Sequence, residues 1–284
     1  MVATNIADLI YPASAMSLPV FPAGADPGAS FTELLQRSGL AHAPVTEPAS
    51  SGPVLTHATT IVALRYADGV VMAGDRRATA GNVIAHRSMD KVFPADRFSG
   101  VSISGVAGIA AEMVKLFQLE LEHYEKVEGV ALSLEGKANR LGNMVRQNLP
   151  AAMSSGMVVI PIFAGYDLRR KEGRIFNYDI TGGRYEELEF HATGSGGIYA
   201  RGLIKQAWRP TMTRNDAVSL ATASLFEAAD DDSATGGPDA IRGIFPSVAT
   251  ITAGGYTDVP ESEIAAGFEQ FLERKRAVLR GVQA

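Results

Sequence analysis

A predicted β-hairpin at residues 60–75 places the strongest constraint on the fold. Residues 60–66 are β-branched and apolar, Ala67-Asp68-Gly69 is typical of a tight hairpin turn, and residues 70–75 have the composition of a second strand. Residues 91–93 and 100–105 predict another strand pair. Because a hairpin joins antiparallel strands, we expect the sheets to be antiparallel.

The rest of the chain alternates between groups of strands and groups of helices. Two helices are predicted first, then three strands, two more helices, a strand and a final amphipathic helix that carries Ile264 and Phe268. The predicted ranges are about 107–127, 134–149 (ended by Pro150), 158–166, 173–179, 183–191, 198–208, 215–229 and 247–253. This order favours the α+β class, as a four-layer αββα sandwich of two antiparallel sheets with helix pairs outside.

Residues 1–58 differ from the rest of the chain in composition. They hold seven of the fourteen prolines and only five charged residues, and proline disrupts both helices and sheet ladders. A short helix is expected only at 30–36, where Ser30 is a candidate N-cap and Glu33 its capping-box partner. Two interpretations stay open for this leader: a disordered tail or linker, and a propeptide removed on maturation. The predicted division is therefore 1–58 and a single domain at 59–284.

Composition excludes several classes of function. The 284 residues are 46% hydrophobic and 20% charged, which is ordinary for a globular protein with a substantial core. The net charge of −5 gives no reason to expect nucleic acid or an anionic membrane surface as a partner. Because the chain has no cysteine, disulfides, thiolate metal sites and a cysteine nucleophile are impossible. The first residues lack the basic region of a signal peptide, and no apolar run is long enough for a membrane helix.

Thr59, Asp75 and Lys91 are the candidate catalytic residues. A threonine hydroxyl needs an adjacent base to act as a nucleophile. If Thr59 were the first residue, its own α-amine, with a pKa of about 7.7–8.0, would be that base. A nearby lysine ammonium would lower the pKa of the amine and the hydroxyl, and a carboxylate would hold the lysine charged. Asp75 ends the second predicted strand and Lys91 begins the next, so an antiparallel arrangement can bring all three residues to one sheet end.

Simpler interpretations compete with this one. Thr59-Thr60 is also explained by strand propensity alone, and Asp75 and Lys91 by an exposed ion pair of little energetic value. The stretch 194–197 is glycine-rich but contains no phosphate-loop or GxGxxG pattern, and Thr193 breaks the GxSxG pattern of serine hydrolases. The five histidines have no metal-ligand spacing, so we expect no metal and no cofactor.

From Thr59 to about Val259 the chain resembles a β subunit of the 20S proteasome, of the actinobacterial type. The blocks that carry the resemblance are 59–64, 71–79, 90–92, 105–108, 121–125, 194–196 and 230–237. The spacings from Thr59 to Asp75 (75 − 59 = 16) and to Lys91 (91 − 59 = 32) also agree with the family. The resemblance implies the N-terminal-nucleophile hydrolase fold, which is the same αββα sandwich.

The resemblance also implies roles for individual residues. Thr59 would be the nucleophile, with Asp75 and Lys91 as its charged partners. Gly105 would supply an oxyanion-hole N–H, which is typically worth about 2.7–4 kcal/mol in the transition state. The residues implied to bind around the threonine amine are Ser195, Asp232 and Thr235, and those implied to contact the substrate are Ala78, Thr79, Met89, Ile103 and Ala107.

Three features depart from the family pattern, and one is that Gly196-Gly197 follows Ser195 where another serine is common. Thr235 stands where many members have serine, and Ala58 stands before the nucleophile where glycine is usual. A hydroxyl is kept at 235, so we expect little loss there. Glycine allows the tight backbone conformation that self-cleavage needs, so alanine is expected to slow cleavage between Ala58 and Thr59.

The function implied by the resemblance is that of a threonine-type proteasome endopeptidase, made as a zymogen and activated by autocatalytic cleavage. It would assemble with α subunits and other β subunits in stacked heptameric rings, work with a ring ATPase, and degrade unfolded or tagged proteins in the cytoplasm. The apolar residues at its first specificity pocket favour hydrophobic or small side chains over acidic ones. Two alternatives stay open: an N-terminal-nucleophile amidase acting on a small molecule, and a non-catalytic structural subunit of the same assembly.

Overall fold

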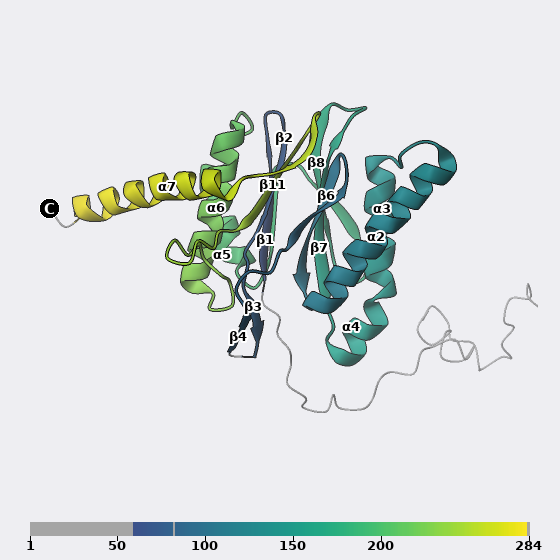
Figure 1. Cartoon of the computed structure of the whole chain (residues 1–284), viewed down its shortest axis with the longest axis horizontal. Coiled ribbons are helices and arrows are strands. Elements are labelled where there is room, and N and C mark those ends of the chain that lie inside the picture. The colour runs from purple at the N-terminus through teal and green to yellow at the C-terminus, as the bar shows by residue number, and fades with distance from the viewer. Residues whose placement is uncertain (1–58, 82, 283–284) are drawn as a thin grey trace, which may run out of the picture. The chain divides into compact units, whose positions relative to one another are not determined.

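The computed structural model describes residues 59–81 and 83–282. The predicted leader, with its short helix at 30–36, lies outside the described residues. Within the described part, two five-stranded sheets pack face to face at the centre, and helices cover the outer face of each sheet (Figure 1). Every neighbouring strand pair is antiparallel, as the hairpin pattern predicts.

The strand order is β10-β1-β2-β11-β12 in the first sheet and β5-β6-β7-β8-β9 in the second. The first sheet consists of β1 (Thr60–Tyr66), β2 (Gly69–Gly74), β10 (Phe190–Gly194), β11 (Ser247–Thr252) and β12 (Gly255–Asp258). The second consists of β5 (Val92–Asp96), β6 (Ser99–Gly105), β7 (Val159–Asp167), β8 (Glu172–Tyr178) and β9 (Arg184–Glu187). A separate ribbon pairs β3 (Ala78–Ala80) with β4 (Val83–His86).

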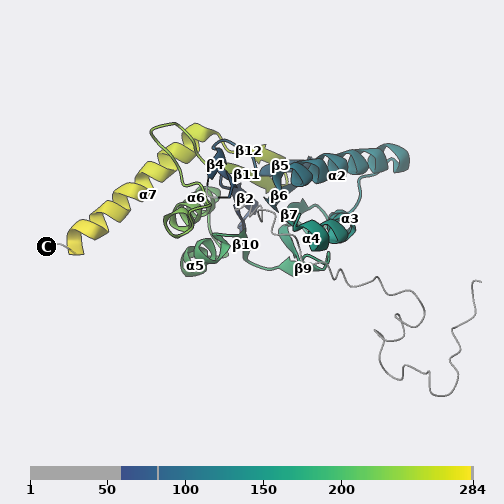
Figure 2. The ribbon, with the colours of Figure 1, turned by 90° about the horizontal axis from the view of Figure 1, so that it is seen from below.

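The helices complete the four layers. The second sheet packs against α2 (Ala107–Glu128) and α3 (Leu134–Gln147), which the short α4 (Leu149–Ser155) follows. The first sheet packs against α5 (Gly197–Ala207) and α6 (Arg214–Asp231), and α7 (Glu261–Val282) contacts α6 (Figures 1 and 2). The αββα sandwich predicted from the sequence is confirmed.

Burial on both faces explains why β1 is apolar throughout. Ile61 and Ala63 lie in the cluster between the two sheets, whereas Val62 and Leu64 lie in the cluster under the helices α5 and α6. Side chains alternate between the two faces of a strand, so a strand covered on both sides has no polar face. Each fully buried aliphatic side chain contributes roughly 1.5–3 kcal/mol, which makes β1 a firm support for the residue that precedes it.

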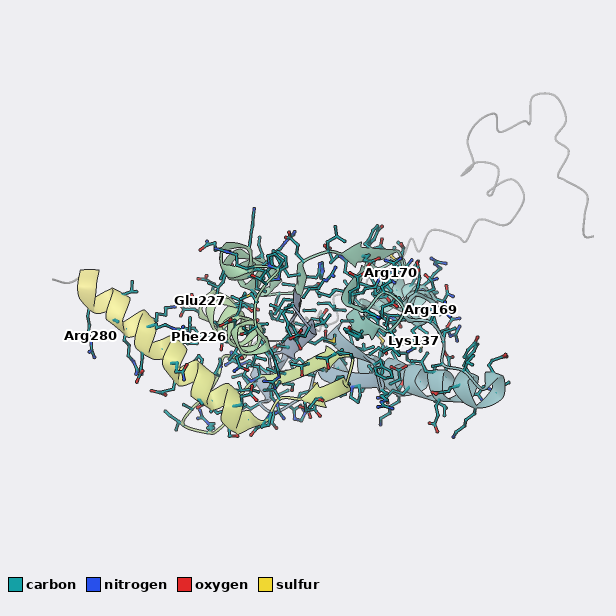
Figure 3. The ribbon with its side chains drawn as sticks, turned by 90° about the horizontal axis from the view of Figure 1, so that it is seen from above. Lys137, Arg169, Arg170, Phe226, Glu227 and Arg280 are labelled. Carbon is teal, nitrogen blue, oxygen red and sulfur yellow. The ribbon has the colours of Figure 1, made fainter. Side chains whose placement is uncertain are left out.

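The beginning of α7 is fixed by aromatic and charged contacts to α6. Phe226 and Glu227 of α6 lie on the side that faces α7 (Figure 3). Lys275 of α7 binds Glu227, and its ammonium lies 4.9 Å from the centre of the Phe226 ring. The ring of Phe268 packs against that of Phe226 in a tilted arrangement, at a centroid distance of 5.4 Å. Arg280, near the end of α7, lies well away from the two sheets (Figure 3).

The register of the first hairpin brings Asp75 next to the start of β1. Ile61 pairs with Gly74 and Tyr66 with Gly69, so Thr60 and Asp75 face each other just beyond the last pair. The Asp75 N–H donates to the Thr60 carbonyl at 3.0 Å. Thr59, which precedes β1, and Asp75, which follows β2, therefore lie at the same end of the first sheet.

Lys91 reaches this end of the sandwich from the other sheet. It directly precedes β5, which belongs to the second sheet. The expectation that one sheet end would carry all three candidate residues is therefore wrong. Gly74 allows the two sheets to approach here, because a Cβ on Gly74 would lie 3.0 Å from the Lys91 Cβ. The candidate site is thus built between the sheets, where both contribute.

Other elements also differ from the sequence prediction. The single strand expected at 183–191 is two strands, β9 and β10, which lie in different sheets. The helix predicted at 134–149 is α3, which ends at Gln147; Pro150 lies in the first turn of the further short helix α4, which was not predicted and where proline's missing N–H is not needed. The strands β3, β4 and β12 were not predicted; they are only three or four residues long.

Candidate active site

Thr59 lines an apolar cavity whose other lining residues come from the segment 89–93, from the end of β6 and from the start of α2. Its exposed fraction is 6%, and the cavity has a volume of about 380 Å³. Lys91 and Gly105 share the lining with Thr59, and the remaining lining residues are Met89, Asp90, Phe93, Ile103, Ala107, Gly108, Ala110 and Ala111. The cavity is therefore a hydrophobic recess with one buried cation and one threonine at its edge.

Asp75 is fully buried, and its carboxylate accepts four hydrogen bonds. Its Oδ1 accepts from the Thr60 N–H at 2.8 Å and from Lys91 Nζ at 2.6 Å. Its Oδ2 accepts from the N–H groups of Arg77 at 2.9 Å and Gly236 at 2.8 Å. Because a buried carboxylate is costly unless its oxygens are satisfied, this saturation explains how Asp75 is tolerated at zero exposure.

Lys91 is held in a single position by two acceptors. Its Nζ donates to Asp75 Oδ1 and to the Arg77 carbonyl, both at 2.6 Å. The side chain is only 3% exposed, so the alternative of an ordinary surface ion pair is excluded. Burial lowers the pKa of Lys91 below its ordinary value of 10.5, and the charge of Asp75 opposes this. Lys91 is therefore a positive charge directed at the cavity edge and easier to deprotonate than a free lysine.

Ser195, Asp232 and Thr235 form a connected group beside Thr59. The carboxylate Oδ2 of Asp232 accepts from the Ser195 and Thr235 hydroxyls, each at 2.5 Å. The Thr235 hydroxyl lies 2.6 Å from the Thr60 hydroxyl, which also accepts from the Gly196 N–H at 2.9 Å. Three residues that the resemblance singles out are therefore brought together, and Thr60 is a fourth member that the sequence did not indicate.

The backbone of residues 194–195 holds Thr59 directly. The Ser195 N–H donates to the Thr59 carbonyl at 3.1 Å. Gly194 has φ of +96°, and a Cβ there would lie 1.6 Å from the same carbonyl oxygen. Only glycine permits both this conformation and this close approach. The glycine-rich stretch at 194–197 thus serves to hold the start of β1.

Gly105 is the last residue of β6 and lines the cavity together with Thr59. It has φ of +113°, and a Cβ would lie 2.0 Å from the Val158 carbonyl oxygen. The backbone at this point is therefore one that other residues would strain.

The five predicted substrate contacts separate into two groups. Met89, Ile103 and Ala107 line the cavity with Thr59. Ala78 and Thr79 are buried in β3 and are not among the lining residues. Phe93, Ala110 and Ala111 line the cavity although the sequence reasoning did not name them. Phe93 follows a predicted strand start and the two alanines lie in a predicted helix, so no local signal marks them.

Two further findings bear on function. In residues 59–81 and 83–282, no group of three or more histidine, aspartate or glutamate side chains is placed to hold a metal ion. No helix in the part of the chain that the structure describes has the length and hydropathy needed to cross a membrane.

Comparison with known proteins places this site in a family context. The sequence pattern of the family described as proteasome subunit matches residues 55–242. The chain is 55% identical over 265 residues to the proteasome subunit beta of Acidimicrobium ferrooxidans, which covers 92% of this chain and 97% of the relative. It is 59% identical over 222 residues to the proteasome subunit beta of Streptomyces griseus, which covers 77% of this chain and 78% of the relative. The family match at residues 55–242 includes Thr59 and the residues that surround it.

Proposed function

The chain belongs to the proteasome subunit family and is a β subunit with a protease role, and on this premise we propose that it is a threonine endopeptidase of the 20S core particle whose nucleophile is Thr59. The observation that carries the proposal is the buried Asp75–Lys91 pair, which shares one apolar cavity with Thr59. In a purely structural subunit, apolar residues of similar volume would serve about as well at these positions, because a buried ion pair generally stabilises a fold no better than they do.

In the proposed reaction, the α-amine of Thr59 acts as the general base once it is free. Thr59 Oγ1 attacks the carbonyl carbon of the peptide bond and its proton passes to the amine. The positive charge of Lys91 lowers the pKa of both groups, which favours the attacking form near neutral pH. Asp75 keeps Lys91 oriented through the 2.6 Å contact.

The tetrahedral intermediate then breaks down to an ester. The peptide C–N bond breaks, the amine product takes the proton held by the α-amine, and the acyl group stays on Thr59 Oγ1. Water attacks the ester carbonyl with the same amine as base, which releases the acid and restores the hydroxyl. The Gly105 N–H would stabilise the oxyanion in both steps. Ser195, Asp232 and Thr235 would hold the amine in place.

We further propose that residues 1–58 are a propeptide that blocks the amine of Thr59. Cleavage between Ala58 and Thr59 would create the base and the nucleophile together, so the full-length chain is expected to be an inactive zymogen. Cleavage would be autocatalytic, because the same hydroxyl can attack the carbonyl of Ala58. The two reactions of this site, cleavage of the propeptide and cleavage of substrates, would then depend on the same residues.

The cavity supports a preference for apolar side chains. Six of its eleven lining residues are apolar side chains (Met89, Phe93, Ile103, Ala107, Ala110 and Ala111), and the Lys91 ammonium is already paired with Asp75, so an acidic side chain would be costly to desolvate there. A fluorogenic peptide that ends in Leu or Tyr is therefore expected to be cleaved much faster than one that ends in Glu. Equal rates on the two peptides would contradict this assignment of the cavity.

The partners are proposed from the family. The chain would assemble with α subunits and further β subunits into stacked heptameric rings in the cytoplasm. A ring ATPase would supply unfolded or tagged proteins to the enclosed sites.

The decisive experiment compares variants of Thr59 in particles coexpressed with the α subunit of the same organism. Wild-type particles should hydrolyse the Leu-ending peptide, and Thr59→Ala should lower the rate by about a thousandfold or more. Thr59→Ser keeps a hydroxyl and should retain part of the activity. Thr211→Ala, a control at an exposed threonine, should behave as wild type. Wild-type activity in Thr59→Ala would contradict the proposal.

A further inference from the structure

We propose that Thr60 is a positioning residue for the reaction, because its hydroxyl fixes the backbone and the side chains that hold Thr59. This inference rests on the proposed function, since it assigns a role in the same reaction. Thr60 has an exposed fraction of zero and does not line the cavity, so it has no contact with the substrate. Its effect must pass through its neighbours.

Hydrogen counting gives the direction of the hydrogen bonds that Thr60 makes. Each hydroxyl carries one hydrogen, whereas an ionised carboxylate only accepts. The Thr235 hydroxyl uses its hydrogen on Asp232 Oδ2, at 2.5 Å. In the 2.6 Å contact between Thr60 and Thr235, the hydrogen must therefore come from Thr60. Thr60 Oγ1 in turn accepts from the Gly196 N–H at 2.9 Å.

The result is a one-directional chain of hydrogen bonds that ends on a carboxylate. It runs from the Gly196 N–H to the Thr60 hydroxyl, then to the Thr235 hydroxyl and then to Asp232. Successive hydrogen bonds of this kind polarise and strengthen one another in a low-dielectric interior. Thr60 is an inner member, so loss of its hydroxyl would separate the Gly196 N–H from the Thr235–Asp232 pair.

Both ends of this chain of hydrogen bonds act on Thr59. The Gly196 N–H belongs to the same short segment as Ser195, whose N–H holds the Thr59 carbonyl at 3.1 Å. The Asp232 carboxylate also accepts from the Ser195 hydroxyl. Without the Thr60 hydroxyl, the segment 194–196 would lose an anchor and the Thr235 hydroxyl would lose its donor. Thr59 and its proposed amine base would then be less precisely placed.

The groups around the Thr60 hydroxyl are packed so closely that no other group can replace it. A Cβ on Gly196 would lie 2.6 Å from both the Thr60 and the Thr235 hydroxyl oxygens. The Thr60 N–H is already used on Asp75 Oδ1 at 2.8 Å. Thr60 therefore joins the Asp75–Lys91 pair, through its backbone, to the Ser195–Asp232–Thr235 group, through its side chain.

The test compares two substitutions that differ only in the hydroxyl. Thr60→Val keeps the branched shape and removes the hydroxyl, and Thr60→Ser keeps the hydroxyl and removes the methyl group. In assembled particles acting on the Leu-ending peptide, Thr60→Val should lower kcat on the order of tenfold to a hundredfold with KM nearly unchanged, because misplacement of a reacting group acts on the chemical step. Thr60→Ser should stay within about threefold of wild type.

Thr250→Val is the matched control. Thr250 is a buried threonine in β11 of the same sheet, and its hydroxyl has only a long contact of 3.5 Å with the Thr257 carbonyl. The Thr250→Val variant should therefore have the same kcat as wild type. A second readout is deuterium exchange in the peptide that spans 192–198: Thr60→Val, or the smaller Thr60→Ala if the valine variant does not assemble, should exchange faster there than Thr60→Ser.

The outcomes separate this inference from the proposed function. If Thr60→Val lowers thermal stability but keeps kcat and the exchange of 192–198 at wild-type values, Thr60 is merely structural and the inference is overturned. Equal losses in Thr60→Val and Thr60→Ser would also overturn it, because the hydroxyl would then not be the cause. If instead wild type and Thr59→Ala have equal activity, the proposed function itself fails, whatever Thr60 does.

Discussion

Replacing Asp75 with asparagine is expected to destabilise the fold strongly, although the two side chains have nearly the same shape. The amide keeps one acceptor oxygen and replaces the other with an NH₂ donor. Two of the four donors that Asp75 now satisfies would then face another donor, whichever way the amide is turned. One pair consists of the Thr60 N–H and Lys91 Nζ, and the other of the N–H groups of Arg77 and Gly236.

The magnitude follows from burial. A buried donor left without a partner costs about 1–3 kcal/mol, so two give about 2–6 kcal/mol. Removing one member of a buried ion pair costs about 3–5 kcal/mol in measured cases, which lies inside that range. We therefore expect a loss of about 3–5 kcal/mol for Asp75→Asn. With a urea m-value of about 2–3 kcal/mol/M, the unfolding midpoint would fall by about 1–2.5 M.

The assay is urea unfolding of the full-length chain followed by tryptophan fluorescence. Trp208 is the single tryptophan, and its indole N–H donates to the Arg65 carbonyl of β1 at 2.8 Å, so its emission reports on the first sheet. Asp239→Asn is the control, because Asp239 also accepts two backbone N–H bonds but lies near the surface. It should shift the midpoint far less.

A double-mutant cycle isolates the charge. Lys91→Met removes the ammonium group, so Asp75→Asn should cost less in that background than in wild type. A midpoint for Asp75→Asn within about 0.3 M of wild type would refute the reasoning, because the four hydrogen bonds would then contribute almost nothing.

Three further predictions follow from single positions. Gly194→Ala should abolish peptidase activity in particles, because its Cβ would overlap the Thr59 carbonyl, whereas Gly202→Ala in α5, with open space around it, should assemble and cleave normally. Burial lowers the pKa of His191 below 6.5, so the folded state binds a proton less readily than the unfolded state. The free energy of unfolding should therefore fall as the pH drops below 6.5. In thermal melts across pH 5–7, the melting temperature of His191→Gln should decline less than that of wild type. Ala58→Gly should speed the appearance of the processed chain in a time course read by mass spectrometry, and an unchanged or slower rate would remove the reason given for the expected delay.

Local signals explain what the sequence predicts correctly. The hairpin at 60–75 depends on a turn of two residues, Ala67 and Asp68, and the helix α2 is followed by Gly129 in the left-handed conformation expected of a helix terminus. These features are decided by neighbours in the chain. The position of Asp75 is also decided locally, because it follows a strand that the sequence predicts correctly.

The features that the sequence did not predict depend on pairing between residues far apart in the chain. Nothing near Lys91 indicates that β5 pairs in the other sheet, and nothing near Leu188 indicates that the chain changes sheets between β9 and β10. The Thr60 hydroxyl contacts Gly196 and Thr235, which are 136 and 175 residues away. The resemblance named the residues around the site, but the hydrogen-bond chain through Thr60 depends on tertiary packing that no local pattern encodes.

The most direct test of the central claim is the intact mass of the chain in particles assembled with its α subunit. The account requires a mass that starts at Thr59 in wild type, because only then is the α-amine free to act as base. Thr59→Ala particles should retain residues 1–58, since the hydroxyl that cleaves them is gone. A full-length wild-type chain in active particles would contradict the account, because the proposed base would still be bound in a peptide bond.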